Sequence, residues 1–535
     1  MEKKDQHETA TEAARPASKS FKGGSSGYQA RAAGASISAS DIEDEAGSIA
    51  AKALSYGDPD PEKSRRVLRK LDTYILPCLC ITYSLQFMDK ASLSYSSVYG
   101  IIQDTHLTGQ DYSWASSIFF FGFMLAQYPG MVIMQRFPIA KFLGYSIVIW
   151  GFALMATAAS SSFVGLAAAR FVLRMAEATI TPGFVAMTSI WWTRREQAGR
   201  SALWLSFLGV GGFVGSLAIF GIGHIHGSLS SWRYIFLILG SVTVMWGFVF
   251  LFFVPDGPAQ VRWLSADEKV VAVQRVIENR MGTKSRRFVK AQVVEALTGP
   301  KVIVLGLLQF VIATAAGGFS FGPLIISGFG FDPLQTTLMM LPYTAVQVIS
   351  QLGCGLLTSK IPNSRLHVAS LAMLPPIAGT ILISQLPTEN KWGRVTGFWV
   401  LGFHLVVFTI ALGLLGTNIA GSTKRSVALG WSFVSFGVGN IAGPHFFKSS
   451  EAPVYQSGII SMLCSFVLAL ILAQILRLMC VAENKKRNRE LARRSPDEIA
   501  ELKRIGDRQG FEDVTDKENV SDQSESPLSG RKTAR

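Results

Sequence analysis

The sequence predicts an all-α membrane protein with twelve transmembrane helices in two six-helix, pseudo-symmetric bundles. Of its 535 residues, 49% are hydrophobic and only 16% are charged, a balance that is typical of chains embedded in lipid. Apolar runs long enough to cross a bilayer recur about twelve times. They form two equal blocks around a polar stretch, which is the pattern of two related bundles with a binding site between them.

The predicted spans divide the chain into five parts. These are an arm (1–65), a first bundle (66–254), a central loop (255–300), a second bundle (301–480) and a tail (481–535). The first block has spans near 72–94, 113–135, 141–160, 163–190, 200–223 and 232–254, and the second near 301–327, 337–358, 366–386, 395–418, 425–447 and 456–480. In the central loop, Ser265-Ala-Asp-Glu268 predicts a capping box that opens a short helix. The arm and the tail lack apolar periodicity, so we expect most of both to be disordered.

Lys and Arg residues predict the orientation in the membrane. They gather in alternate loops on the same side as both tails, which places both termini in the cytosol. Four cations depart from this pattern: Arg233, Lys391, Arg394 and Lys448. No cleavable signal peptide is visible before the first span. The five cysteines show no zinc spacing and imply no disulfide framework.

Three charged residues inside the fourth span are the strongest functional signal. Arg170, Arg174 and Glu177 follow one another at steps of four and three, so they share one helix face. Hydrocarbon cannot solvate such a stripe, and ionisable groups in membranes usually bind ions, protons or substrates. The structural alternative is a static ion pair between Arg174 and Glu177 that only neutralises the helix.

Other polar residues in the spans are weaker candidates. Asp89-Lys90, near the outer end of the first span, is either a helix-end anchor or a substrate and coupling site, and Gln86 lies one turn before Lys90. His404 could carry a proton, although a neutral imidazole bonded to a neighbouring helix is favoured. Asn440 could bind a polar ligand or hold helices together. Pro77 and Pro182 predict kinks, and the glycines at 209, 211, 212 and 215 predict close helix packing.

The sequence shows no Walker A pattern, no H-E-x-x-H and no hydrolase nucleophile elbow. We therefore expect no enzyme activity and no cofactor or metal, and energy must come from an ion gradient. The net charge of +14 lies mainly in the tails and short loops, which favours a topological role and argues against nucleic acid as a partner.

Short motifs spread over the membrane part resemble one known family. Those of the first half are Lys70-Leu-Asp72, Phe87-Met-Asp-Lys90, Tyr112-Ser-Trp114, Tyr128-Pro129, Gln135-Arg136 with Pro138 and Lys141, Arg170 to Glu177, Pro182-Gly-Phe184, Gly221-Ile-Gly-His224, Trp232-Arg-Tyr-Ile-Phe236 and Pro255-Asp256. Later ones are Trp263-Leu-Ser265, Ala420-Gly421, Thr423-Lys-Arg425, Gly439-Asn-Ile441 and Gly443-Pro444. In order and coverage they resemble the major facilitator superfamily, specifically the fungal allantoate permease family of anion:cation symporters. The chain departs from the family at Arg174, where Gly is usual, and at Gln135-Arg136, which replaces an acidic-basic loop.

The resemblance implies an alternating-access carrier that takes up a small organic anion, such as a vitamin, ureide or carboxylate, with protons. We expect Arg170, Arg174, Lys90, Gln86 and Asn440 to bind the substrate, and a plasma-membrane monomer. Glu177, Asp89 and His404 are the candidates for proton coupling. Two alternatives remain: a proton-driven exporter of a fungal metabolite, and a nutrient sensor that signals through its tails without net flux.

Overall fold

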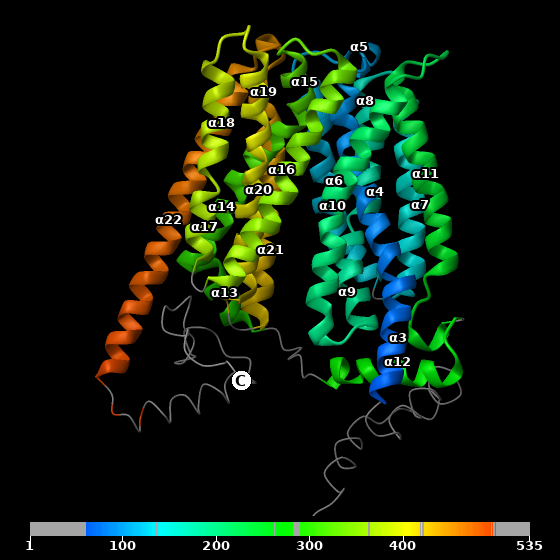
Figure 1. The fold of residues 1–535 in the computed structure, drawn as a ribbon, viewed down its shortest axis with the longest axis vertical. Helices are drawn as coiled ribbons and strands as arrows, with labels where there is room; N and C mark the ends of the chain where they lie inside the picture. Colours follow the sequence, from blue (N-terminus) through cyan, green and yellow to red (C-terminus); the bar gives the residue numbers. More distant parts are fainter. Residues whose placement is uncertain are drawn as a thin grey trace, which may run out of the picture.

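The computed structural model describes residues 60–493, 495 and 498, apart from 135, 262, 282–288, 362–363, 418 and 420–421. Every regular element in these ranges is a helix (Figure 1). Most of the arm and tail lies outside the described residues, so their disorder stays a prediction. The predicted arm boundary at residue 65 was wrong, because Asp60 caps a helix by accepting the Glu62 N–H at 3.0 Å and Pro61 begins it.

The first block of spans forms one bundle, drawn in blue to green in Figure 1. Its elements are α3 (Pro61–Tyr74), α4 (Leu76–Ser96), α5 (Ile101–Asp104), α6 (Asp111–Met134), α7 (Ile139–Ala158), α8 (Phe163–Glu177), α9 (Ile180–Trp191), α10 (Arg194–Gly223) and α11 (Ser231–Phe253). The short helix α5 lies at one end of the bundle and the central-loop helix α12 (Ala266–Met281) at the other. These are called the α5 end and the α12 end below.

The second block forms the other bundle, with α13 (Lys290–Thr298) at its α12 end. Its α-helices are α14 (Pro300–Gly317), α15 (Gly322–Ser327), α16 (Pro333–Lys360), α17 (Arg365–Leu371), α18 (Leu374–Gln385), α19 (Lys391–Val400), α20 (His404–Thr417), α21 (Ser422–Ala442) and α22 (Gln456–Ala492). Single 3-10 turns, η3 (Gly318–Phe321), η4 (Leu401–Phe403) and η5 (Gly443–Phe446), join some of them. The predicted tail boundary at 481 was wrong, since α22 continues to Ala492 beside an ion pair between Lys301 and Glu483.

Ten of the twelve predicted spans coincide with helices that are long and apolar enough, within the described ranges, to cross a membrane. The first and fourth do not. The fourth is divided into α8 and α9, of 15 and 12 residues, and the first into α3 and α4, whose 21 residues include Asp89 and Lys90. The breaks lie between α3 and α4 and between α8 and α9, at Ile75 and at residues 178–179. Pro77 and Pro182 follow them; proline lacks an N–H and its ring clashes with the carbonyl four residues earlier. The kinks predicted at both prolines are confirmed as helix breaks.

The two bundles repeat the same packing. In the first bundle α4 packs on α10, α6 on α8 and α7 on α11; in the second α14 packs on α21, α16 on α19, and α18 on α22. The bundles meet where α10 contacts α16 and α6 contacts α21. The predicted pseudo-symmetric architecture is therefore confirmed, and the candidate site residues of the first bundle lie on α4 and α8.

Glycines bring α10 close to its neighbours, as their spacing predicts. A Cβ atom at Gly211 would lie 2.8 Å from the Ser84 Cα of α4, and one at Gly215 would lie 2.9 Å from the Met88 side chain. Ser84 also donates a 3.1 Å hydrogen bond to the Phe207 carbonyl of α10. This close approach fixes the rotation of α4, and hence the direction of its charged residues.

Three of the four cations that depart from the loop charge pattern bind backbone carbonyls near helix ends. Arg233 donates to the Ala158 carbonyl at 2.6 Å, where α7 ends. Lys391 donates to Gly330 at 3.0 Å after α15, and Arg394 to Ile383 at 3.2 Å in the last turn of α18. Helix C-termini carry partial negative charge, so these cations stabilise local structure.

The two helices of the central loop attach to different bundles. In α12, Arg275 Nη2 lies 2.7 and 2.8 Å from the two Glu196 carboxylate oxygens of α10, and Glu268 accepts 2.7 and 2.8 Å hydrogen bonds from Lys70 of α3. The capping box at Ser265 and Glu268 is confirmed by both of its hydrogen bonds. On α13, Gln292 accepts the backbone N–H groups of Thr423 and Lys424 at 3.2 Å, and Glu295 pairs with Lys424 at 3.0 Å. Each bundle therefore carries its own part of the loop.

Candidate functional site

The helix α8 carries Arg170, Arg174 and Glu177 along one side, as their spacing predicts. Arg170 is 2% exposed and Glu177 1% exposed. Arg174 Nη1 donates a 2.8 Å hydrogen bond to Glu177 Oε2. The ion pair that the sequence allowed as a structural alternative is thus formed, while the ligand-binding role of these residues stays a prediction.

Two phenylalanines of α6 hold the guanidinium groups. The Arg174 Cζ atom lies 4.5 Å from the ring centroids of both Phe119 and Phe123, and the Arg170 Cζ atom lies 4.9 Å from Phe119. Cation–π attraction of this kind stabilises a charge that has been removed from water. The sequence reasoning missed both rings, because Phe at helical spacing cannot be told from core.

Several polar atoms of this cluster are buried without a hydrogen-bond partner among the described residues. They are Nε and Nη1 of Arg170, Nε of Arg174, Oε1 of Glu177 and Oδ1 of Asp89. Buried donors and acceptors are nearly always paired, and an unpaired one costs free energy. The three unpaired guanidinium nitrogens have N–H groups that could bind an oxyanion.

On α4, Asp89 lies in the interior of the first bundle. It is 0% exposed, and its Oδ2 accepts a 3.3 Å hydrogen bond from Thr243 of α11. The Trp150 indole of α7 lies close to the same carboxyl group, but its Nε1 does not reach hydrogen-bond geometry. The charges of Arg170 and Glu177 act on Asp89, so this carboxyl group belongs to the α8 cluster.

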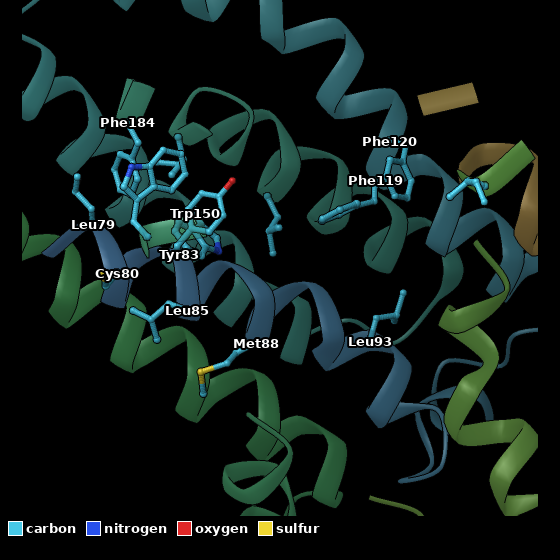
Figure 2. Close-up of a cluster of buried hydrophobic side chains, with 14 of the residues drawn as sticks. Leu79, Cys80, Tyr83, Leu85, Met88, Leu93, Phe119, Phe120, Trp150 and Phe184 are labelled. Carbon is cyan, nitrogen blue, oxygen red and sulfur yellow. The ribbon is translucent and has the colours of Figure 1, made fainter. Parts of the chain in front are cut away.

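Lys90 also faces the cluster, although its side chain is accessible. Its Nζ atom lies 5.6 Å from the Phe120 ring of α6, and Arg170, Arg174 and Glu177 interact with it electrostatically. Figure 2 shows the apolar surroundings: Tyr83, Trp150 and Phe184 gather along one part of α4, while Phe119 and Phe120 lie further along, toward Leu93. A purely interfacial anchor would not lie among these charges, so the geometry favours the site interpretation of Lys90.

The remaining predicted residues are less closely connected. Gln86, one turn before Lys90 on α4, is buried. Asn440 donates to the Phe436 carbonyl of its own helix at 2.9 Å. His404 Nδ1 lies 2.9 Å from the Leu401 carbonyl, in the turn that precedes it. The structural alternative expected a hydrogen bond to a neighbouring helix; the described partner is this turn.

The His404 ring packs within the second bundle. It stacks on Phe319 with the ring centroids 4.5 Å apart, and the charge of Lys90 acts on it from the first bundle. Of the predicted site residues, the structure groups Asp89, Lys90, Arg170, Arg174 and Glu177 on α4 and α8. His404 lies on α20 of the other bundle.

Two tyrosines that the sequence reasoning did not select adjoin the cluster. The Tyr83 hydroxyl lies 3.1 Å from Thr181 Oγ1, and Arg174 and Glu177 act on it electrostatically. Tyr112 interacts with Arg170 and donates a 3.0 Å hydrogen bond to the Ser320 carbonyl of the other bundle. Tyr112-Ser-Trp114 was noted as a motif, which was the only signal in the sequence.

Hydrogen bonds seal the two bundles together at the α5 end. Ser113 and Ser117, one turn apart on α6, donate 2.9 Å hydrogen bonds to the carbonyls of Pro444 and Ile441. The His445 ring contacts Trp114 at 4.6 Å and Ser117 Oγ at 3.3 Å. Because α21 ends at Ala442, the Ile441 carbonyl in its last turn is available to accept. The charged cluster therefore lies on the α12 side of a closed seal.

The arrangement suits anion binding and proton exchange between carboxyl groups. Within the described ranges no group of three or more His, Cys, Asp or Glu side chains could hold a metal ion. The described cysteines, at positions 78, 80, 354, 464 and 480, are all free thiols.

Comparisons with known proteins agree with this architecture. A family model described as the Major Facilitator Superfamily matches residues 79–444. An uncharacterized transporter of Schizosaccharomyces pombe is 37% identical and covers 85% of each chain. The allantoate permease of Saccharomyces cerevisiae is 31% identical and covers 90% of each. The structure of a bacterial homologue of the human lysosomal transporter Spinster, with 15% identity, superimposes with a TM-score of 0.59 over 76% of this chain and 96% of that one.

Proposed function

The chain belongs to the Major Facilitator Superfamily, and from this premise we propose that it imports a small organic anion together with a proton. Its relatives are membrane transporters and not enzymes. Members of this fold move substrate by rocking two bundles around a site near the bilayer midplane. We assign that position in this chain to the cluster on α4 and α8.

One observation carries the proposal: three guanidinium nitrogens of Arg170 and Arg174 are buried and have no hydrogen-bond acceptor among the described residues. A carboxylate can accept two such donors at once, with charge-assisted hydrogen bonds that are about twice as strong as neutral ones. The rings of Phe119 and Phe123 fix the plane of Arg174, so little orientational freedom is lost when the anion binds.

Proton coupling follows from the pair between Arg174 and Glu177. While Glu177 is ionised, it occupies Arg174 Nη1 and repels an incoming anion. A proton on Glu177 removes both effects, so the proton and the anion favour each other's binding. Asp89 makes no ion pair within the described residues and lies deeper in the bundle; it is the second candidate to carry the proton.

The similarity to the allantoate permease supports an anionic substrate. A panel of ureides, vitamins and carboxylates is therefore the first set to test. We propose that Lys90 attracts the anion, and that Gln86, Asn440 and His404 contact the uncharged parts of the substrate. His404 is also a further candidate to carry the proton.

The same proposal includes an orientation. The alternate-loop cations and both ends of the described chain lie toward the α12 end, which we place in the cytosol, as is usual for positively charged loops. The conformation described here would then be closed to the outside and would present the site to the cytosol. We place the protein in the plasma membrane as a monomer that uses the proton gradient and no cofactor.

Uptake by proteoliposomes with an imposed proton gradient tests the proposal. Glu177→Gln should remove the pH dependence of uptake, and Arg174→Gly should raise KM for the anion. Glu483→Gln is the matched control, because Glu483 pairs with Lys301 far from the site. Unchanged transport and pH dependence in both site variants would remove the assignment. Proton-driven accumulation only in inside-out vesicles would instead show an exporter.

A further inference from the structure

The helix α3 has a basic face whose side chains have no partner in the described chain. Lys63, Arg65, Arg66 and Arg69 are all exposed, and none of their side chains forms an ion pair or a hydrogen bond with a described residue. The next cation, Lys70, differs from them because it pairs with Glu268 of α12. Neighbouring charges of one sign repel each other, so an anionic partner would relieve this repulsion.

The opposite face of α3 is docked, which fixes where the cations lie. Val67 is 0% exposed and Leu71 1% exposed, and α3 packs on α12. At 100° per residue, Arg65, Arg66 and Arg69 lie on the side of the helix away from this apolar stripe, whereas Lys63, four residues before Val67, lies at its edge. The docking of α3 therefore presents the basic face in one direction.

Aromatic residues lie at the end of α3 that adjoins the membrane helix α4. Tyr74, the last residue of α3, stacks on Trp263 with the ring centroids 4.8 Å apart, and such rings collect at membrane–water interfaces. The Ile75 N–H bonds to the Leu71 carbonyl at 3.0 Å, so backbone hydrogen bonding continues across the break from α3 to the membrane helix α4. With a rise of about 1.5 Å per residue, Arg69 lies roughly 8 Å and Lys63 roughly 17 Å from Tyr74 along the axis.

We propose that this face of α3 binds the phosphate groups of anionic lipid headgroups. Three of its four cations are arginines, whose planar guanidinium groups match phosphate oxygens in pairs. A row of basic residues directly beside a membrane helix attracts an anionic leaflet, with about 1 kcal/mol for each Lys or Arg near the surface. The lipid is favoured over a soluble anion because the face begins within a single turn or two of the interface.

The test uses the full-length protein in detergent, titrated with short-chain phosphatidylserine and short-chain phosphatidylinositol 4-phosphate, with phosphatidylcholine as the neutral lipid. The variant Arg65→Gln/Arg66→Gln/Arg69→Gln should bind both anionic lipids roughly 100-fold more weakly than the unmodified chain. The matched control is Lys485→Gln/Lys486→Gln/Arg489→Gln, which removes three exposed cations from the end of α22. This control should keep its affinity.

A second variant separates geometry from charge. Arg65→Lys/Arg66→Lys/Arg69→Lys keeps the charge and should bind with intermediate affinity, because ammonium groups lack the paired donors. Size-exclusion profiles and α12 hydrogen exchange establish that each variant is folded. Equal losses of lipid affinity in the α3 and α22 variants would mean that binding depends only on the net charge of the protein, which would overturn the proposal. Equally tight binding of soluble inositol phosphate would overturn the assignment to a membrane surface.

Discussion

Arg174 donates a 2.8 Å hydrogen bond to Glu177 one turn further along α8, while two aromatic rings cover its guanidinium group. The rings restrain the cation, whereas the carboxylate can leave once it is protonated. Arg174 is therefore the fixed member of the pair and Glu177 the exchangeable one. Substrate affinity should depend on the rings as well as on the charges.

Replacement of these rings should weaken substrate binding in a defined order. Phe119→Leu affects both Arg170 and Arg174, whereas Phe123→Leu affects Arg174 alone. One cation–π contact contributes about 0.5–2 kcal/mol, so KM for the anion should rise roughly 2- to 30-fold in Phe123→Leu and further in Phe119→Leu. Initial uptake rates measure this. Phe121→Leu, an exposed neighbour on α6, is the control, and a larger effect of Phe123 than of Phe119 would contradict the assignment.

The attachment of α12 to the first bundle should depend on the pair between Arg275 and Glu196. Arg275 is nearly buried, so either Arg275→Met or Glu196→Gln leaves an unpaired polar group and should cost about 1–3 kcal/mol. The double variant should lose less than the sum, because no unpaired charge remains. Thermal unfolding and hydrogen exchange of α12 measure the effect. The control is Lys141→Gln, because Lys141 forms a longer and more exposed ion pair with Asp256; this variant should change stability little. Strictly additive losses in the double variant would argue against an interaction between Arg275 and Glu196.

The contact between α3 and α12 should weaken in acid. Hydrogen bonds from Lys70 hold the pKa of Glu268 below its ordinary value. A lowered folded-state pKa stabilises the fold at a pH above the ordinary glutamate value of about 4.3, and this contribution is lost as the pH falls through the folded value. Thermal unfolding measured from neutral to acidic pH should show a smaller acid loss in Lys70→Met than in the unmodified chain. Parallel pH profiles for the two proteins would exclude this contribution.

The seal at the α5 end should control which way the site opens. Ser113→Ala/Ser117→Ala removes two hydrogen bonds between the bundles, each contributing about 0.5–1.5 kcal/mol. The equilibrium should shift toward opening at the α5 end by roughly 5- to 150-fold. Electron-spin distances between labels at His106 and Ser450, both exposed, would report a larger population of long distances. Ser206→Ala, whose hydroxyl bonds only within α10, should leave the distribution unchanged, and an unchanged double variant would show that the seal lies elsewhere.

Two glycines of α10 should respond oppositely to alanine. A Cβ at Gly211 would collide with the backbone of Ser84, whereas a Cβ at Gly221 would meet nothing within 4 Å. Gly211→Ala should separate α4 from α10 and lower the yield of folded protein. Gly221→Ala should be neutral or stabilise the helix by up to about 1 kcal/mol. Fluorescence-detected size-exclusion yields and unfolding temperatures compare the two; equal behaviour would mean that α4 and α10 are not held at this distance.

The sequence predicts the architecture well because lipid imposes a simple rule on span length and polarity. It also predicts which residues share a face of α8, since their helical spacing determines that. It does not reveal Phe119 and Phe123 as partners of Arg174, because this contact depends on how α6 rotates against α8. The sequence also shows only that Lys90 lies near the end of its span. That Lys90 is turned toward the charged cluster depends on how α4 packs on α10.

The division of the central loop has a mechanical consequence. Because α12 is bonded to one bundle and α13 to the other, each helix can move together with its own bundle. The covalent link between Met281 and Lys290 then acts chiefly as a tether that sets the effective concentration of one half near the other. Two separately expressed halves divided within this link would each keep their own surface helix.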